Sequence, residues 1–283
     1  MFPAYMARRV KELKFGGDMR IVTCVKQMPD PESPASLYSI DDVNKKVVPS
    51  SNVPPDVSDY DRYGVEAALM LKDKDADVHI SVVSLGIDHS LDVIKRPVAM
   101  GCDDLYLIQG EDLDDPDPSI TSHGLVAAVN QIGDVDLITF GRQSGNRDQA
   151  SVGPGVAVIL GWPCVTNAVD LEDIGDGKLR VERLSEGGTE IVEVNLPAVL
   201  TFSSEMPHQP RYATMRGIMQ AKRVEPTIWS ASDLGLDVAS LEKIEVLDVF
   251  FPTSTTEVEI IEGDSPAEAG RALAQRLREA RVI

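Results

Sequence analysis

The sequence predicts an α/β protein with a mostly parallel, doubly wound sheet that antiparallel strands extend. Short β-rich apolar runs alternate with helical runs from residue 20 to residue 160, which is the pattern of a parallel sheet with helices on both faces. After residue 161, strand-like runs follow one another with Gly-rich turns between them, which is the pattern of β-hairpins.

Composition bounds the class of protein. The chain has 283 residues, of which 43% are hydrophobic, so it is long enough for a well-formed core. Its net charge of −19 argues against binding nucleic acid or an anionic membrane through general electrostatics. The three cysteines are far apart and match no metal spacing, which favours reduced thiols in a cytoplasmic protein. No apolar run of about 18 residues is present, so we expect no membrane span.

The parallel part is built from four strands and the helices between them. The strands are the apolar runs at residues 20–25, 78–86, 105–108 and 135–140. Helical spacing predicts a helix from about residue 59, capped by Ser58 or Asp59, a second over 88–100 with Pro97 as a kink, a third over 119–132, and a fourth at 156–160. A small hairpin is expected from the runs at 38–41 and 46–49.

The second half of the chain has a different pattern. The runs at 165–171, 178–183, 189–195 and 198–202 predict hairpin-linked antiparallel strands. A loop and a short helix follow over 207–223, and Ser265 with Pro266 marks the start of a last helix. We therefore divide the chain into an N-terminal extension (1–18), an α/β nucleotide-binding domain (19–225), and an extended arm with a C-terminal helix (226–283). The arm has no core of its own, so we expect it to pack on a partner subunit.

The candidate site is the Gly-rich loop at residues 141–155, between the fourth strand and a helix. Such a loop offers main-chain N–H groups to an anion, and the helix N-terminus adds a partial positive charge. The loop is neither a P-loop nor a G-x-G-x-x-G fingerprint, so an ordinary strand-to-helix turn stays open as the alternative. Ligands in open parallel sheets bind beyond the carboxyl ends of the strands. This rule adds residues 24–26, 84–86 and the helix start at 59–61 to the candidate site.

Residues typical of catalysis or metal binding do not cluster in the sequence. The four histidines, at positions 79, 89, 123 and 208, are scattered, and none is spaced with a nucleophile or second ligand. The acidic run at 112–117 lacks the EF-hand pattern and is expected to be a solvated loop. We therefore predict no catalytic residue and no metal site.

Taken together, several segments resemble the β-subunit of electron-transfer flavoproteins. The resemblance covers Met19 to Ile283, and the segments that carry it are 24–30, 63–69, 99–103, 141–143, 149–153, 196–199, 210–215 and 218–222. It implies an adenine-nucleotide α-hydrolase-like fold and a heterodimer with the electron-transfer flavoprotein α-subunit. The α-subunit would hold most of the electron-transferring FAD, while this chain would bind AMP or a second FAD in its own pocket.

The resemblance also implies the residues of that pocket. The expected cofactor-binding residues are Cys24, Lys26, Asp59, Tyr60, Asp61, Ser84, Leu85, Gly86, Gly141, Arg142, Gln143, Ser144, Gly145, Asn146, Arg147, Asp148, Gln149, Ala150, Ser151, Val152 and Gly153. The loop departs from the family pattern in three places, because the family commonly has Asp at position 146 and Gln at 151, and Arg147 adds a positive charge. These departures leave the ligand open between AMP and FAD.

The resemblance further implies partners and alternatives. Residues 207–223 are similar to the family's partner-recognition loop, with Tyr212, Met215 and Ile218 as docking residues and Met215 as the anchor for an acyl-CoA dehydrogenase-type flavoenzyme or a quinone oxidoreductase. The chain would then be an electron-transfer protein rather than a stand-alone enzyme. One alternative is an electron-bifurcating form that oxidises NADH and carries two FAD. Another is an ATP-using enzyme of the adenine-nucleotide α-hydrolase-like group, which requires a Ser-Gly-Gly-x-Asp-Ser loop where this chain has Cys-Val-Lys-Gln at 24–27.

Overall fold

A nine-stranded, mostly parallel sheet forms the centre of the computed structural model, which describes residues 19–114, 116–252 and 258–283. In sheet order the strands are β11 (Gly188–Asn195), β10 (Lys178–Ser185), β9 (Cys164–Gly175), β12 (Ala198–Phe202), β8 (Leu137–Gly141), β1 (Arg20–Cys24), β6 (His79–Gly86), β7 (Asp104–Gln109) and β13 (Thr227–Trp229). The predicted fold class is confirmed.

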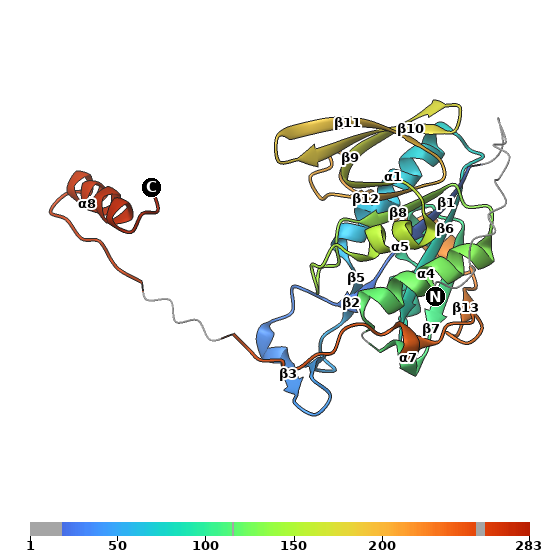
Figure 1. The fold of residues 1–283 in the computed structure, drawn as a ribbon, viewed down its shortest axis with the longest axis horizontal. Coiled ribbons are helices and arrows are strands. Elements are labelled where there is room, and N and C mark those ends of the chain that lie inside the picture. Colours follow the sequence, from blue (N-terminus) through green and yellow to red (C-terminus); the bar gives the residue numbers. More distant parts are fainter. Residues whose placement is uncertain (1–18, 115, 253–257) are drawn as a thin grey trace, which may run out of the picture.

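Helices cover both faces of the sheet (Figure 1). One apolar core contains buried residues of α1 (Asp59–Lys74), α2 (Leu91–Ile94), α3 (Arg96–Met100) and α6 (Met215–Ala221). A second core, on the opposite face, contains residues of α4 (Pro118–Ile132), α5 (Val152–Leu160) and α7 (Val238–Leu241). Along the strands the side chains alternate between the two cores, so that Ile21 belongs to the first and Val22 to the second.

The direction of winding reverses at β1. From β1 the chain passes through α1 to β6 and then through α2 and α3 to β7, moving to one side of β1. It then crosses through α4, on the other face, to β8, which pairs in parallel with the opposite edge of β1. The carboxyl ends of β1 and β8 therefore flank a topological switch point, where doubly wound sheets bind their ligands.

Two small ribbons precede α1. The predicted hairpin at 38–41 and 46–49 is present as β3 (Tyr38–Asp41) and β4 (Lys46–Pro49), just after the short 3-10 helix η1 (Ala35–Leu37). Nearer the sheet, β2 (Gln27–Pro29) pairs with β5 (Pro55–Val57) and leads the chain back to the start of α1. A second 3-10 helix, η2 (Glu111–Leu113), precedes α4.

Some boundaries and one strand direction differ from those expected. Strand β12 is not antiparallel: it lies between β9 and β8 and pairs in parallel with both. The predicted helix over 88–100 is two helices separated at Lys95, with Pro97 in the first turn of the second. Helix α5 begins at Val152, within the Gly-rich segment. Ser58 precedes α1, but its side chain makes no capping hydrogen bond.

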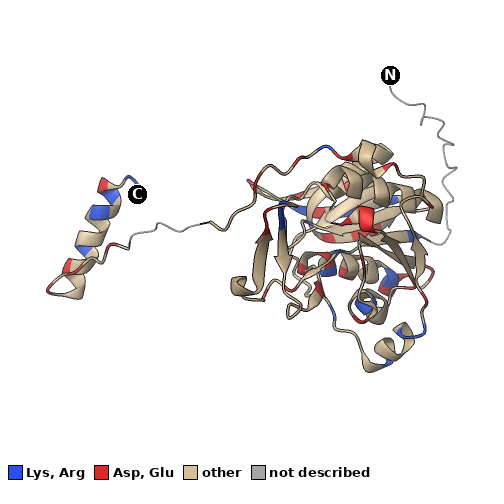
Figure 2. Cartoon of the chain, turned by 90° about the horizontal axis from the view of Figure 1, so that it is seen from below, with Lys and Arg blue, Asp and Glu red and all other residues tan. Residues whose placement is uncertain are grey.

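The C-terminal arm is attached to the start of α4 through the Asp117 side chain. Asp117 caps α4 by accepting the N–H of Ile120 on Oδ1 (2.8 Å). Its Oδ2 accepts the N–H groups of Lys243 (2.6 Å) and Ile244 (3.1 Å), which lie within the predicted arm. The last helix, α8 (Pro266–Glu279), is capped by Ser265 as expected and lies apart from the sheet in both views (Figure 1, Figure 2).

The N-terminal extension, residues 1–18, lies outside the described residues. The predicted division between residues 225 and 226 falls two residues before β13, which pairs with β7 in parallel. Trp229 of β13 stacks on Tyr106 of β7 with 5.1 Å between the ring centres. The first part of the predicted arm is thus joined to the sheet, and the division itself stays a prediction.

Candidate functional site

A buried carboxylate joins the two strand ends at the switch point. Asp61, in the first turn of α1, accepts the main-chain N–H of Lys26 on Oδ2 (2.7 Å) and that of Gly141 on Oδ1 (3.2 Å). These residues follow β1 and end β8. Burial raises the pKa of Asp61 to about 7, although both hydrogen bonds and the Lys26 charge lower it. Asp61 therefore shapes the site by holding its main chain, and its two oxygens are already engaged.

Close contact between α1 and the end of β8 explains Gly141. A Cβ at this position would lie 2.4 Å from the carbonyl carbon of Tyr60 and 2.6 Å from the nitrogen of Asp61. Gly64, one turn further along α1, is equally restricted by the main chain of Phe140 at 2.8 Å. Both glycines let the helix start lie directly on the strand end, so the loop after Gly141 emerges beside the N-terminus of α1.

The Gly-rich loop is held across the site by two further contacts. Lys26 Nζ donates to Asn146 Oδ1 (3.1 Å), and the Gly145 N–H donates to Ser58 Oγ (3.3 Å). The Ser58 hydroxyl therefore accepts from the loop instead of capping α1. Asn146 retains an oxygen acceptor for Lys26, so the amide can serve in place of the carboxylate that the resemblance leads us to expect at this position.

The second half of the loop presents main-chain donors. In the part of the chain that the structure describes, the main-chain N–H groups of residues 149–153 donate no hydrogen bond. Ala150 has a φ of 52° and the next residue, Ser151, is right-handed with a φ of −103°, an alternation that turns successive N–H groups toward one side. Gly153 leaves no room for a side chain, since a Cβ there would lie 2.7 Å from Thr201 Cγ2. Free N–H groups at the start of α5 suit an anion such as phosphate.

The third wall is the loop after β6. Ser84 is buried, and its hydroxyl lies 2.9 Å from His89 Nε2, while Gln109 Nε2 lies 3.0 Å from His89 Nδ1. Burial lowers the pKa of His89 to about 4, although the charge of Asp88 raises it. The imidazole is therefore neutral near pH 7. Gln27 ties this loop to β2 by accepting the Ser90 N–H (2.7 Å) and donating to the Asp88 carbonyl (3.2 Å).

The structure thus brings the four predicted segments to one edge of the sheet. Cys24 is there, but its thiol is buried in the core of the α4 and α5 face, and burial followed by the Asp61 charge raises its pKa well above the ordinary value. Within the loop, Gln143 Nε2 donates to Asp148 Oδ1 (2.7 Å). Four residues that contact the candidate site were not among the expected cofactor-binding residues: Gln27, Ser58, His89 and Gln109. In the sequence, the only signal for each of them is its position close to the end of a strand.

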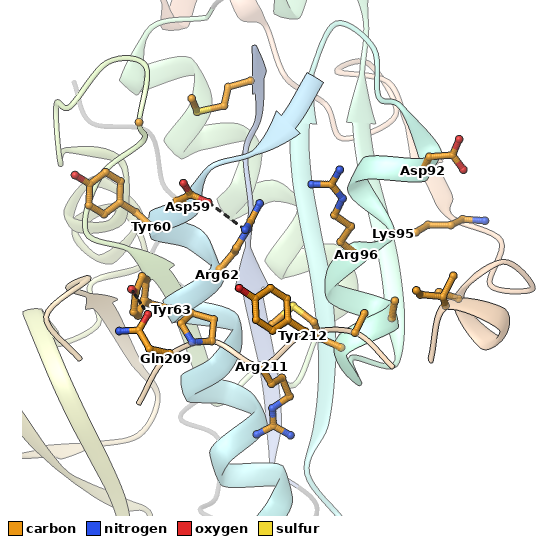
Figure 3. A pocket seen from close by; sticks show the side chains of 18 of the residues that line it. Asp59, Tyr60, Arg62, Tyr63, Asp92, Lys95, Arg96, Gln209, Arg211 and Tyr212 are labelled. Atoms are coloured by element: carbon orange, nitrogen blue, oxygen red, sulfur yellow. Dashed lines mark hydrogen bonds and ion pairs between the residues drawn. The ribbon is translucent and has the colours of Figure 1, made fainter. Parts of the chain in front are cut away.

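A broad cavity of about 1150 Å³ adjoins this site on the α1 face. Gly145 is among the residues that line it. Tyr60 and Tyr63 lie on one side, and Arg62 and Arg96 project toward its centre (Figure 3). Both of these arginines pair with Asp56, Arg62 Nη2 at 3.2 Å from Oδ1. Arg142, which follows the end of β8, stacks over the Tyr60 ring at 5.5 Å. The aromatic side chains and the Gly-rich loop therefore share one rim.

The far rim of the cavity is the docking segment, which we define as residues 209–221. Its three predicted docking side chains are exposed: Tyr212 by 92%, Met215 by 77% and Ile218 by 38%. Met219, which was not predicted, is exposed by 56%. Large apolar side chains gathered on one short exposed segment are typical of an interaction site.

Among the described residues, no three His, Cys, Asp or Glu side chains are arranged to hold a metal ion. No helix in these residues combines the length and the apolar character needed to cross a bilayer. Basic and acidic side chains are interspersed over the face seen in Figure 2.

Comparison with known proteins gives a consistent result. Residues 47–234 match a family model described as the electron transfer flavoprotein domain. The chain is 32% identical over 269 residues to the caffeyl-CoA reductase-Etf complex subunit CarD of Acetobacterium woodii, covering 94% of this chain and 100% of that protein. It is 35% identical over 229 residues to the electron transfer flavoprotein subunit beta of Megasphaera elsdenii, covering 79% and 82% of the two chains. It is also 30% identical to protein FixA of Azorhizobium caulinodans over 77% of this chain and 78% of that one.

Proposed function

The chain belongs to the electron-transfer flavoprotein β-subunit family, and from this we propose the specific role that it has in electron transfer. We infer that it forms a heterodimer with an α-subunit and carries electrons through FAD between a flavin dehydrogenase and an acceptor oxidoreductase. The flavin supplies the redox chemistry, while the protein supplies binding, orientation and electrostatics.

The loop that follows β8 supports a nucleotide site within this chain. Its free N–H groups at residues 149–153 lie at the start of α5, next to the switch point of the sheet. This is the single observation that carries the proposal, because such donors bind phosphate without a dedicated side chain. The ligand we propose is AMP or a second FAD, with the phosphate on these N–H groups.

The cavity beside Tyr60 and the exposed arm support contact with the α-subunit. Tyr60 and Tyr63 offer apolar ring surface on the same rim as the nucleotide loop, which suits a flavin held by a neighbouring subunit. The arm exposes Leu247 by 76% and Phe250 by 73%, and no segment of the described chain covers them. Apolar side chains so exposed need a partner surface, and we propose that the α-subunit provides it.

The docking segment supports a partner flavoenzyme. Met215 is flexible and apolar, so it suits insertion into a pocket of an acyl-CoA dehydrogenase-type enzyme or a quinone oxidoreductase. The Acetobacterium relative is named as a subunit of a caffeyl-CoA reductase-Etf complex, which agrees with a CoA-ester oxidoreductase as the partner class.

Nucleotide extraction tests the proposal. The chain is purified with its α-subunit, the nucleotides are released by acid, and each is quantified per heterodimer. One FAD and one AMP support the simple electron carrier. A heterodimer with neither nucleotide would overturn the proposed function.

The second candidate is the electron-bifurcating form, which oxidises NADH. The long arm favours it, because the arm resembles that branch of the family. The match to the Acetobacterium subunit extends over 94% of this chain and so includes most of the arm. Two FAD per heterodimer, with reduction of the flavin by NADH, would favour this form over the simple carrier.

A further inference from the structure

The docking segment is joined to helix α1 by an unusually dense set of contacts. Arg211 immediately precedes the exposed Tyr212, and its side chain turns back toward α1 (Figure 3). Its Nε lies 2.9 Å from Glu66 Oε2 and its Nη2 lies 2.8 Å from Glu66 Oε1, which is the bidentate geometry that only an arginine fork provides. The main-chain N–H of Arg211 also donates to Glu66 Oε2 at 2.9 Å.

A second carboxylate completes this contact. Asp73 lies two turns further along α1, and its oxygens accept from Arg211 Nη1 (3.2 Å) and Nη2 (2.6 Å). Glu66 is buried, with 5% of its surface exposed, whereas the Asp73 side chain is 60% exposed. The Arg211 hydrogen bonds lower the pKa of Asp73, and the hydrogen bonds to the two carboxylates raise the pKa of Arg211, so the Arg211–Asp73 pair stays ionised near pH 7. We call Arg211, Glu66 and Asp73 the clamp.

The other end of the docking segment is fixed by backbone contact. A Cβ on Gly217 would lie 2.1 Å from the carbonyl oxygen of Ala99, so α6 touches α3 at main-chain distance. Thr214 caps α6 by accepting the Gly217 N–H at 3.0 Å. Met215 and Tyr212 therefore lie on a short stretch that is held on both sides.

From this arrangement we propose that Arg211 is the positioning residue of the docking segment, holding Tyr212 and Met215 in their outward conformation before a partner arrives. The proposal rests on the docking role inferred above. Glu66 would serve the same end, since its buried carboxylate is satisfied by the arginine fork and by the main chain of the segment. A segment ordered in advance loses less conformational entropy on binding, so the clamp strengthens docking without touching the partner.

The test compares docking with flavin reduction that needs no docking. The FAD-loaded heterodimer is reduced by an acyl-CoA dehydrogenase with its acyl-CoA substrate, at increasing heterodimer concentration, and separately by dithionite. For Arg211→Gln we expect a half-saturating concentration about tenfold higher, an unchanged maximal rate and unchanged reduction by dithionite. Arg211→Lys keeps the positive charge but not the forked guanidinium. Its half-saturating concentration is expected to lie between those of the wild type and Arg211→Gln. Asp73→Asn, which leaves the Glu66 contact in place, is the matched control and is expected to change the concentration less than threefold.

Two further measurements separate positioning from general stability. Amide hydrogen exchange in residues 212–219 should become faster in Arg211→Gln, while exchange in β1 and β8 stays as in the wild type. The double variant with Met215→Ala should lose less affinity than the sum of the two single losses, because Arg211 acts in part through the Met215 side chain. Additive losses, or a wild-type half-saturating concentration in Arg211→Gln, would overturn the inference.

Failure of the proposed partner is distinguishable from failure of the clamp. If the wild-type heterodimer takes no electrons from acyl-CoA dehydrogenases, the partner class is wrong, and the exchange measurement then decides alone. Unchanged exchange in residues 212–219 of Arg211→Gln overturns the positioning role, and faster exchange confined to that segment supports it. Should Arg211→Gln fail to fold, the same measurements on Arg211→Lys apply.

Discussion

Replacing the buried carboxylate at the switch point should change how stability depends on pH. In Asp61→Asn the side chain keeps its size but loses its titration, and one of its two acceptors becomes an NH₂ group facing a main-chain N–H. Burial raises the pKa of Asp61 from 3.8 to about 7, against the hydrogen bonds from Lys26 and Gly141 and the Lys26 charge. At 1.36 kcal/mol per pKa unit, the difference corresponds to about 4 kcal/mol between the fully protonated and fully ionised limits.

The sign follows from proton binding. A folded-state pKa above the unfolded value means that the folded protein binds this proton more tightly, so the stabilisation is fully present below about pH 4 and is lost as the pH rises to about 7. The free energy of unfolding of the wild type, minus that of Asp61→Asn, should therefore fall by about 2 kcal/mol between pH 5.5 and pH 8. Cys24 and Lys26 are the other titratable groups that act on this carboxylate, and both are unchanged in the variant.

Urea unfolding of the full chain, followed by circular dichroism at pH 5.5, 6.5, 7.5 and 8, measures this difference. Taking the difference between two proteins at each pH cancels the titration of all groups that they share. A difference that does not change with pH would refute the raised pKa. A difference that grows with pH would show that the two N–H donors outweigh burial at this site.

Three other variants probe the rest of the site. Gly141→Ala places a Cβ 2.4 Å from the Tyr60 carbonyl carbon, so we expect a loss of about 1–3 kcal/mol in urea unfolding and a heterodimer with less bound nucleotide; wild-type nucleotide content would contradict it. Arg147→Ala should lower nucleotide retention on gel filtration, because the exposed side chain adds positive charge beside the expected phosphate, whereas equal retention would show that Arg147 does not hold the phosphate. Met215→Ala should slow electron transfer with the partner enzyme and leave the flavin content as in the wild type, and unaltered transfer kinetics would exclude the anchor role.

Hydrophobic patterning was enough to predict the parallel core and the edge of the sheet where the site lies. The apolar runs that became β1, β6, β7 and β8 are short and bounded by turn residues, and the rule for strand ends then grouped residues 24–26, 59–61, 84–86 and 141–153. The direction of β12 was beyond this reasoning. Its connection from β11, Leu196-Pro197, is as short as that of a hairpin, yet the strand pairs with β9 and β8, which only the packing of the whole sheet decides.

Roles of individual side chains were harder to predict than positions. Asp61 and Cys24 lie where the candidate site was expected. However, both carboxylate oxygens of Asp61 accept main-chain N–H groups, and the Cys24 thiol is buried in the core. Glu66 lies in a helix whose pattern gave no reason to bury a carboxylate. Its partner Arg211 is 145 residues away in the chain, and contacts of that separation leave no periodic signal.

The carboxylate of Asp117 connects the start of α4 to the part of the arm around Lys243. We therefore expect these two segments to unfold locally as a single unit. One oxygen holds the first turn of the helix, and the other holds Lys243 and Ile244. Opening either contact frees the shared Asp117 side chain to move, so we expect the amides of Ile120 and Lys243 to exchange with solvent together. Tension on the arm during assembly would thus be transmitted first to α4, which packs against α5 behind the Gly-rich loop.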